Sequence, residues 1–418
     1  MNKNYFSIIL FLISLFILSY TIFKSEIYYD GEVRKDYNVY YFLTLFIFLI
    51  SFLGLFLEKK IKIVISIFFF SIITSFYIFE VYINIKENND KLNKRFDFFK
   101  KELKKDKEIK IIISSKKCSD KKLDIIPLGG IANSKTIYCN ENGYYSIYES
   151  DRYGFNNPDS EHDSEFINYF LIGDSFVHGA CVNRPNDIGS VLRTLSKKSV
   201  LNFGYGGHGP IEELGILREY LTKNTKKIIW FYYEGNDLIN LENSYKNNLI
   251  KNYLNEDNYK QELKVNQNKI DEIGNEIINN YLTKKKNQLN FIKIIKLTKL
   301  RVKLIDAFKG KEKKNNEKNL DLFKQVLQKA KQYSNEHSSK FYFVYLPSHE
   351  RYSVKNYTNS YKKIIKIIND LNINLIDTNK EIFLKNKDPL NLFALKKNSH
   401  YSVEGYYKIA ELILEKTQ

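Results

Sequence analysis

Cysteine is scarce in this chain, and its spacing excludes several kinds of site. Among 418 residues only Cys118, Cys139 and Cys181 are cysteines, and they form no C-x-x-C pair or other metal-binding spacing. The sequence therefore predicts no metal centre and no cofactor. Cys118 and Cys139 lie close together in a polar stretch, which leaves open a disulfide in an oxidising compartment or two free thiols. Cys181 is then the odd cysteine, expected to be buried behind a serine loop.

The chain also lacks any basic and aromatic module of the kind that binds nucleic acid. Its formal charge is +17, from 65 Lys and Arg against 48 Asp and Glu. The lysines are spread along the chain together with Ile and Asn, as expected of an AT-rich genome. We therefore interpret the excess charge as solvated lysine-rich faces, and we expect no nucleic-acid partner.

Charged residues are absent from long stretches near the N-terminus. Residues 5–23 form an uncharged run just long enough to cross a bilayer, and residues 39–57 and 63–79 form two more. No small-residue cleavage site follows the first run, so we predict an uncleaved anchor rather than a signal peptide. Residues 1–86 are thus expected to form three transmembrane helices with membrane lipid as their partner.

The distribution of lysine favours one orientation of these spans. Lys59, Lys60 and Lys62 crowd the second loop and Lys3 precedes the first run, which favours a cytoplasmic position for both. Lysines in the first loop and after the third run oppose this assignment. On balance we expect a multi-pass protein of the bacterial inner membrane whose C-terminal part is extracytoplasmic, or periplasmic.

The remainder of the chain is predicted to form a stalk, a lead-in and one α/β domain. Residues 87–110 mix both charge signs in a helical pattern, and residues 111–166 begin like a strand and end in turn-forming residues. In residues 167–418 short apolar strands alternate with helical patterns, which predicts a parallel sheet covered on both faces. A helical insertion rich in Lys and Asn is expected at residues 238–319. The strands are expected at residues 169–172, 200–203, 227–233, 341–346 and 374–376.

Residues whose side chains or backbone could take part in catalysis lie at the ends of these elements. Gly173-Asp174-Ser175 follows the first strand, a glycine-rich loop at 204–209 follows the second, Asn236 follows the third, and His400 precedes the last helix. Open α/β sheets bind ligands at the carboxyl ends of their strands. The free N–H groups of a helix starting there could also stabilise an oxyanion.

These blocks and their order resemble the SGNH/GDSL hydrolase superfamily, whose members include membrane-anchored bacterial envelope proteins. The blocks here are Gly173–Ser175, residues 202–207, residues 235–237 and residues 398–405. The resemblance covers roughly residue 169 to the C-terminus. It implies a three-layer α/β/α, flavodoxin-like fold.

The resemblance also implies roles for individual residues. Ser175 is the expected nucleophile and His400 its base. The expected oxyanion donors are the backbone N–H of Ser175, the backbone N–H of Gly207 and the side chain of Asn236. Gly206 is the alternative to Gly207, although the five-residue spacing from Asn202 favours Gly207.

One position departs from the superfamily pattern. An Asp usually stands three residues before the histidine, where this chain has Lys397, and Asn398 lies two residues before it. Three hypotheses follow: a Ser–His dyad steered by a backbone carbonyl, an acid from elsewhere such as Asp388 or Asp377, or a weakened enzyme.

Four residues beside the blocks are candidates for substrate contact, although each has a structural alternative. The candidates are Asp174, His178, His208 and Asp237. Asp174 is alternatively a supporting residue behind the site, and His178 a polar group at a helix start. Of the other histidines, His349 is expected near the same sheet edge, and His162 and His337 in exposed polar loops.

We therefore expect a membrane-anchored serine esterase that cleaves acyl esters through a Ser175 acyl-enzyme. O-acetyl groups of cell-envelope carbohydrate are the substrate that the resemblance implies. Two alternatives remain: an O-acyltransferase to an envelope glycan, or a non-catalytic glycan-binding or assembly protein on a degenerate hydrolase fold, which Lys397 favours. A further hypothesis is that the lysine-rich insertion docks on anionic lipid.

Overall fold

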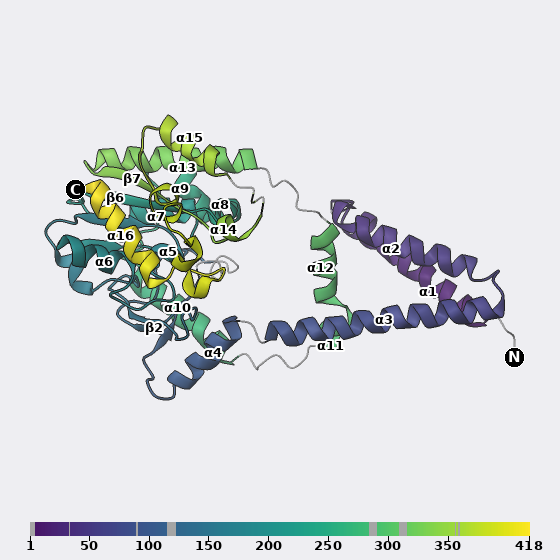
Figure 1. The fold of residues 1–418 in the computed structure, drawn as a ribbon. Coiled ribbons are helices and arrows are strands. Elements are labelled where there is room, and N and C mark those ends of the chain that lie inside the picture. Colours follow the sequence, from purple (N-terminus) through teal and green to yellow (C-terminus); the bar gives the residue numbers. More distant parts are fainter. Residues whose placement is uncertain are drawn as a thin grey trace. The chain divides into compact units, whose positions relative to one another are not determined.

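The computed structural model describes two compact units. It covers residues 5–32, 34–88, 91–114, 123–283, 291–308, 316–355, 357 and 360–418. One unit comprises residues 1–90 and 286–314, and the other comprises residues 91–285 and 315–418. We call them the helical unit and the sheet unit, and each is described by itself (Figure 1).

The helical unit is built on three long helices whose outer surfaces are apolar. They are α1 (Tyr5–Ile22), continued by the π-helical turn η1 (Phe23–Tyr28), α2 (Arg34–Leu53) and α3 (Lys59–Asn88). Large side chains such as Phe16, Phe42 and Phe70 are 71, 71 and 72% exposed. A helix that is apolar all round suits an apolar surrounding better than water.

Two of these helices are long and apolar enough to cross a membrane. The qualifying stretches are Phe11–Tyr28 and Lys59–Lys86, whereas the apolar part of α2, Tyr37–Leu53, is shorter. The predicted three spans are therefore supported for α1 and α3, while α2 stays a prediction.

The sheet unit contains the predicted parallel sheet. The strand order is β5-β4-β6-β7-β8, and every neighbouring pair is parallel. Numbered within the sheet alone this is 2-1-3-4-5, the order of flavodoxin-like folds. The strands are β4 (Tyr169–Ile172), β5 (Val200–Asn202), β6 (Lys227–Tyr233), β7 (Lys340–Leu346) and β8 (Asn374–Asp377).

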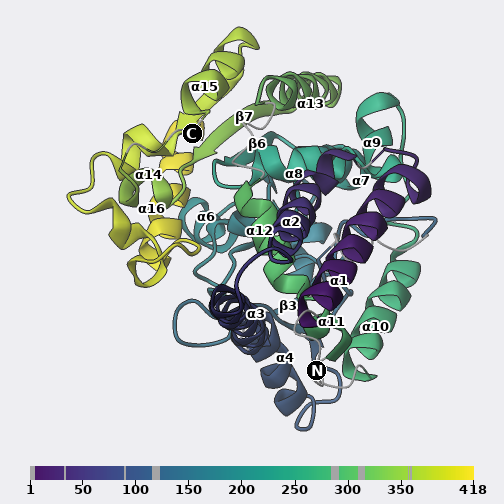
Figure 2. The same ribbon diagram turned by 90° about the vertical axis from the view of Figure 1, so that its right-hand side faces the viewer.

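Helices cover both faces of this sheet, which makes the expected three layers. On one face α6 (Ile188–Ser196) and α16 (Val403–Thr417) pack over Leu171, Phe231 and Val344. The opposite face carries the alternate strand residues, and its covering helices are α7 (Pro210–Tyr220), α13 (Asn316–Glu336) and α15 (Tyr361–Asp370). Figure 2 shows α13 lying beside β7. Because both faces are buried, the strands are continuous apolar runs rather than alternating ones.

The lead-in folds as a small second sheet beside the main one. Strand β2 (Lys135–Ile137) lies between β1 (Lys110–Ile111), to which it is parallel, and β3 (Ile147–Glu149), to which it is antiparallel. The stalk region supplies α4 (Lys91–Glu102), whose Phe99 is fully buried against the lead-in.

The insertion expected at residues 238–319 is divided between the two units. Helices α8 (Asp237–Ser244), α9 (Asn248–Asn255) and α10 (Gln267–Thr283) belong to the sheet unit, whereas α11 (Phe291–Ile295) and α12 (Thr298–Phe308) belong to the helical unit. The remaining short helices are η3 (Asp159–Asp163), α5 (Ser175–His178), α14 (Glu350–Ser353), η4 (Asn379–Phe383), η5 (Pro389–Leu392) and η6 (Ala394–Lys396).

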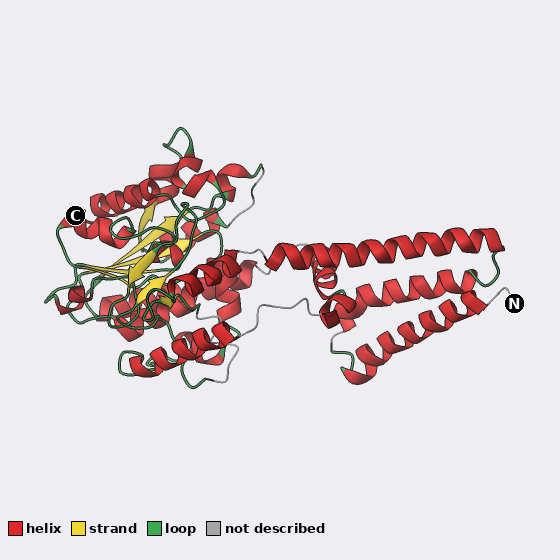
Figure 3. Ribbon diagram, turned by 90° about the horizontal axis from the view of Figure 1, so that it is seen from below, coloured by secondary structure: helices red, strands yellow, loops and turns green. Residues whose placement is uncertain are grey.

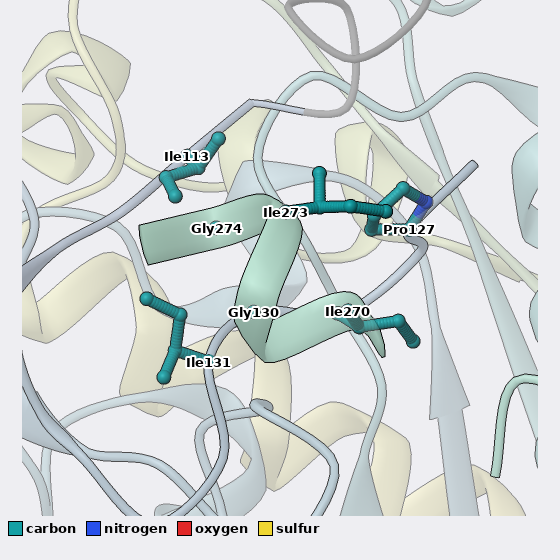
Figure 4. Close-up of a pocket in the computed structure, with 8 residues that line it drawn as sticks. Ile113, Pro127, Gly130, Ile131, Ile270, Ile273 and Gly274 are labelled. Carbon is teal, nitrogen blue, oxygen red and sulfur yellow. The ribbon is translucent and has the colours of Figure 1, made fainter. Parts of the chain in front are cut away.

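A small apolar cavity lies between the lead-in and α10 (Figure 4). Its volume is about 10 Å³, and its walls include Ile113, Ile131, Ile270 and Ile273. An apolar space of this size holds at most one water molecule. The cavity is therefore part of the packing of the lead-in and is not a ligand site.

Candidate active site

The serine occupies the turn where the interior strand β4 ends. Gly173 follows the strand, and a Cβ added to it would lie 2.5 Å from Val177, so the turn is too tight for a larger residue. The Asp174 side chain accepts a hydrogen bond from the Phe176 N–H at 2.9 Å and caps the short helix α5, which begins at Ser175. This local geometry holds the serine hydroxyl at the carboxyl edge of the sheet.

A relay of hydrogen bonds connects Ser175, His400 and Glu141. The Nε2 atom of His400 lies 2.8 Å from Oγ of Ser175. One carboxylate oxygen of Glu141 accepts from both the backbone N–H and Nδ1 of His400, at 2.7 and 2.8 Å. With Nδ1 donating to the carboxylate, the lone pair of Nε2 faces the serine hydroxyl, which is the tautomer that a general base requires.

The acids expected from the sequence lie elsewhere. Asp388 binds Lys396 Nζ at 2.7 Å, which holds the pKa of that carboxyl below its usual range. Asp377 accepts from the Tyr361 hydroxyl and from the Lys380 N–H. Neither carboxylate is a hydrogen-bond partner of His400, so the expectation that one of them orients it is not met.

Glu141 was missed because nothing in the sequence marks it. It lies in the polar stretch Asn140-Glu141-Asn142-Gly143, 259 residues before His400. It also precedes Ser175 in the chain, outside the part that resembles the superfamily. Only folding of the lead-in against the main sheet brings it to the histidine. The dyad steered by a backbone carbonyl is not observed either.

The disulfide prediction is also wrong. Cys139 is bonded to Cys181, whose Cα lies 4.9 Å away although 42 residues separate the two. Cys118, the partner expected from the sequence, lies outside the described residues. Proximity in the sequence was the only available signal, and it does not measure distance between segments that meet through tertiary packing. Cys181 is fully buried, as expected.

Glu141, Cys181 and His400 each offer a metal-ligating atom within 4.8 Å of the others. The Cys181 sulfur is in the disulfide and has no thiolate to offer. The two remaining donors are already paired with each other. The donor set of the oxidised chain therefore suits a charge relay rather than a metal centre.

The expected oxyanion donors belong to loops at the same edge of the sheet. Asn236 follows β6, and its Nδ2 donates to Asp174 at 3.3 Å. Gly207, in the loop after β5, has a φ of +90°, which favours glycine. Gly206 packs against the Tyr138 phenol, so closely that an added Cβ would lie 2.3 Å from its oxygen.

Tyr138 extends from the lead-in over this loop. Its phenol is buried, which raises its pKa, and it lies beside the Ser175 side chain. Its carbonyl accepts from Arg95 on α4 at 3.0 Å. The lead-in thus contributes both a carboxylate to the histidine and an aromatic wall beside the serine.

The four candidates for substrate contact are buried. Asp174 is 2% exposed, and burial raises its pKa, although the Phe176 N–H, His400 and Asn236 oppose this shift. Asp237 accepts from the Tyr233 N–H at 2.7 Å and is 1% exposed. Asp174 thus supports Asn236, and Asp237 supports the turn after β6.

The histidines His178 and His208 are likewise closed to a substrate. His178 lies between the rings of Tyr138 and Tyr148, and burial lowers its pKa to about 3. His208 is 0% exposed and packs on Tyr205. Both are core residues because the glycine loop folds inward over α5.

The other histidines also differ in part from expectation. His162 is not exposed, since its Nε2 lies 2.8 Å from Asp151 in the turn-rich end of the lead-in. His349 follows β7 and its Nε2 lies 3.2 Å from the Lys396 carbonyl. His337 is half-buried against the Tyr333 carbonyl.

Comparison with known proteins gives only remote likenesses. No protein-family model matches the chain, and no curated protein matches it. Among solved structures it is similar to a putative lipolytic protein of the G-D-S-L family from Desulfitobacterium hafniense DCB-2, at 16% identity and a TM-score of 0.33. That match covers 60% of this chain and 98% of the other. An acetyl xylan esterase is similar at 14% identity, with the same TM-score and coverages.

Proposed function

We propose that this protein is a membrane-anchored serine esterase that uses Ser175, His400 and Glu141 as its catalytic triad. The observation that carries the proposal is the continuous relay Ser175 Oγ, His400 Nε2, His400 Nδ1 and Glu141 Oε2, with both hydrogen bonds at 2.8 Å. A serine hydroxyl is a weak nucleophile unless a base accepts its proton, and the base acts best when a third group orients it.

The reaction begins when Ser175 Oγ attacks the ester carbonyl carbon and its proton passes to His400 Nε2. Glu141 stabilises the imidazolium that forms. The oxyanion of the tetrahedral intermediate accepts from the N–H groups of Ser175 and Gly207 and from Asn236 Nδ2. When the intermediate collapses, His400 gives its proton to the departing alcohol oxygen and leaves an acyl-serine. Water then attacks the acyl-serine, with His400 again as base.

The hydrogen bond from Asn236 to Asp174 fits this scheme. One N–H of its amide donates to the buried Asp174, at 3.3 Å. The amide has a second hydrogen, which remains for the oxyanion. Asp174 is then a positioning residue for the oxyanion hole.

The non-catalytic alternative loses its main support. It rested on Lys397 standing in place of the usual acid. Lys397 is exposed, and the carboxylate of Glu141 occupies the position beside Nδ1 that the usual acid would take. Transfer of the acyl group to a glycan hydroxyl uses the same triad and differs only in the final acceptor.

We place the catalytic unit outside the cytoplasm, tethered by the apolar helices. The supporting observations are the exposed apolar surfaces of α1 and α3 and the Cys139–Cys181 disulfide, because disulfides persist in oxidising compartments. The lysine-rich turn between α2 and α3 is then cytoplasmic.

The proposed substrate is a short acyl ester, with O-acetyl groups of envelope carbohydrate as the preferred class. The buried Tyr138 phenol beside Ser175 supports a small acyl group, since it bounds the space next to the nucleophile. The carbohydrate part rests on the resemblance of the sequence motifs.

The deciding experiment is labelling of the full chain in detergent with a fluorophosphonate probe, together with hydrolysis of p-nitrophenyl acetate. We expect labelling of the wild type, none of Ser175→Ala, and strongly slowed labelling of His400→Ala. A folded wild-type chain that neither labels nor releases p-nitrophenol would overturn the proposal. Acetylated glycan oligomers, with analysis of free acetate against transferred acetyl, then separate hydrolysis from transfer.

A further inference from the structure

We infer that the Cys139–Cys181 disulfide is a positioning device for catalysis, which holds Glu141 against His400. This inference rests on the proposed function and deepens it. The bond lies at the active site itself: Cys139 is two residues before Glu141, and Cys181 is six residues after Ser175. The Cys181 sulfur is 3.9 Å from His400 Nδ1.

Other contacts fasten the same two segments to each other. Asn142 Nδ2 donates to the Cys181 carbonyl at 2.9 Å, and the Ile147 N–H donates to Asn183 at 2.9 Å. Arg184 donates to the Glu149 carbonyl at 3.0 Å. The lead-in between Cys139 and Glu149 is thus clamped to the loop that follows the serine helix, with the disulfide at the end nearest Glu141.

The need for such a clamp follows from where the acid comes from. In the motif pattern that the chain departs from, acid and base lie three residues apart and one short turn fixes both. Here they are 259 residues apart, with Glu141 in the loop between β2 and β3 and His400 just before α16. Glu141 lies on a loop between two short strands, without a helix or long strand to hold it. A small loss of position there removes the second hydrogen bond of the relay, because hydrogen bonds weaken steeply with distance and angle.

The disulfide therefore acts through Glu141. Breaking the disulfide should lower kcat in the same way as replacing Glu141 does. The test compares kcat and KM for p-nitrophenyl acetate in four full-length chains: wild type, Cys139→Ser with Cys181→Ser, Glu141→Gln, and the combination of all three. We expect the double substitution Cys139→Ser with Cys181→Ser to lower kcat by about 10- to 100-fold with KM little changed. In the Glu141→Gln background the same double substitution should have almost no further effect.

The pH dependence gives a second readout. Removing a carboxylate from Nδ1 makes protonation of the imidazole less favourable, so the acid limb of kcat/KM moves to lower pH in Glu141→Gln. The double cysteine substitution should move the acid limb of the kcat/KM profile in the same direction. Cys118→Ser is the matched control and should change neither kcat nor the profile.

Each outcome decides the inference. If the double cysteine substitution lowered kcat equally in the wild-type and Glu141→Gln backgrounds, the disulfide would have a structural role alone. That result would overturn the inference. Loss of the native fluorescence of Trp230, the single tryptophan, in the double cysteine variant would also overturn the inference. An active wild type with an inactive Glu141→Gln and a fully active cysteine pair would overturn this inference and leave the proposed function standing. A wild type without activity would instead overturn the proposed function.

A second inference rests on a separate part of the chain. We propose that α12 lies in the bilayer surface and binds the headgroups of anionic phospholipid in the membrane that the long helices span. This presupposes the proposed anchoring. In Figure 1, α12 runs across the long helices of its unit rather than along them, and Figure 3 shows those long helices from below.

The contacts of α12 show which end of the helices it crosses. Glu80, near the end of α3, accepts from the backbone N–H groups of Lys299 and Leu300 at 3.1 and 2.7 Å, and so caps the first turn of α12. Arg301 donates to the hydroxyl of Tyr40, near the start of α2, at 3.0 Å. The end of α3 and the start of α2 lie on the same side of the bundle, and α12 bridges them there.

The surface of this segment is amphipathic. Residues 291–308 contain five Lys or Arg and one Asp. Ile292 and Ile295 of α11 and Val302 of α12 are 65, 64 and 53% exposed. Lys296, between the two helices, and Lys303 of α12 are also exposed. A helical segment of this kind at a bilayer surface buries its apolar residues among the acyl chains and places its lysines among the phosphates.

The test uses the full chain in nanodiscs with brominated acyl chains and the variant Val302→Trp. Trp230 is fully buried and gives the unquenched baseline. We expect the emission of the tryptophan introduced at position 302 to be quenched in discs with one quarter phosphatidylglycerol. The quenching should be weaker in neutral discs or after Lys296→Glu with Lys303→Glu. Val265→Trp, at an exposed site of the sheet unit, is the matched control.

Absence of quenching in anionic discs would overturn this second proposal. Equal quenching in neutral and anionic discs would also overturn it, because the headgroup charge would then play no part. Failure of anchoring itself would appear separately, as a chain that remains outside the discs.

Discussion

The two sheets of the sheet unit contribute to the candidate site in different ways. The main sheet brings Ser175, Gly207 and Asn236 to one edge because each follows a parallel strand, and its last helix is preceded by His400. The lead-in sheet brings Glu141 and Tyr138 from short loops and strands that a disulfide fastens. In the proposed triad, therefore, the main sheet positions the nucleophile and the base, and the acid comes from a separate segment that a disulfide holds in place.

Among the tests of that comparison, replacing Glu141 has the largest expected effect. In Glu141→Gln the imidazole keeps a neutral partner of the same shape but loses the charge that stabilises its protonated form. We expect kcat for p-nitrophenyl acetate to fall by about 10²- to 10⁴-fold. Glu141→Asp should retain more activity than Glu141→Gln. An unchanged kcat would mean that the lead-in takes no part in the chemistry.

The contribution of the main sheet is tested by Asn236→Ala. The variant removes one side-chain donor of the oxyanion hole and leaves the relay intact. We expect kcat to fall by about 10²- to 10³-fold with KM little changed. Asp237→Asn, next in the chain and bound to the Tyr233 N–H, is the matched comparison. A KM effect without a kcat effect would show that Asn236 binds the ground state instead.

A buried carboxyl under the main sheet provides a stability test. Burial, followed by the proximity of Asp237, raises the pKa of Glu213 well above its usual range. Its stabilising contribution is therefore complete below the unfolded pKa of about 4.5 and is lost as pH rises toward the folded value. In that window the free energy of unfolding should fall by up to about 1.4 kcal/mol per pH unit.

Glu213→Gln should flatten this slope, and urea unfolding followed by Trp230 fluorescence between pH 5 and 8 measures it. The exposed residue Glu411, changed to Gln, is the control and should keep the wild-type slope. Equal slopes in wild type and Glu213→Gln would show that Glu213 is ionised in the folded chain.

The smallest expected effect comes from restoring the usual acid. In Lys397→Asp a carboxylate returns to its position three residues before the histidine, but Lys397 is exposed and Glu141 already occupies Nδ1. We expect kcat to change by less than about twofold, as for other surface substitutions. Rescue of Glu141→Gln by Lys397→Asp would show that the two positions are interchangeable.

Much of the fold was predictable because its signals are local. Tyr169–Ile172 and Lys227–Tyr233 are apolar runs bounded by turn residues, and the structure has strands with those bounds. Ile188–Ser196 has helical spacing and forms α6 with those ends. The alternation of such elements was enough to predict a parallel sheet with helices on both faces.

The site was predictable only where a residue sits next to such an element. Ser175, Asn236 and His400 each follow a strand or precede a helix, so their positions followed from the topology. His178 and His208 are equally close to the strands, yet the structure buries both. Their outcome depended on how the glycine loop folds inward, which no local pattern specifies.

The sequence by itself determined where the strands and the apolar helices lie along the chain. It also determined that the serine follows a strand and that the histidine precedes a helix. These depend on periodicity and on neighbours within a few residues. Only the tertiary structure decided the acid, the disulfide and the position of α12. Glu141 reaches His400 across 259 residues, Cys139 reaches Cys181 across 42, and Glu80 reaches Leu300 across 220. Such pairings depend on how distant segments pack together, and the order of residues along the chain carries no direct measure of that.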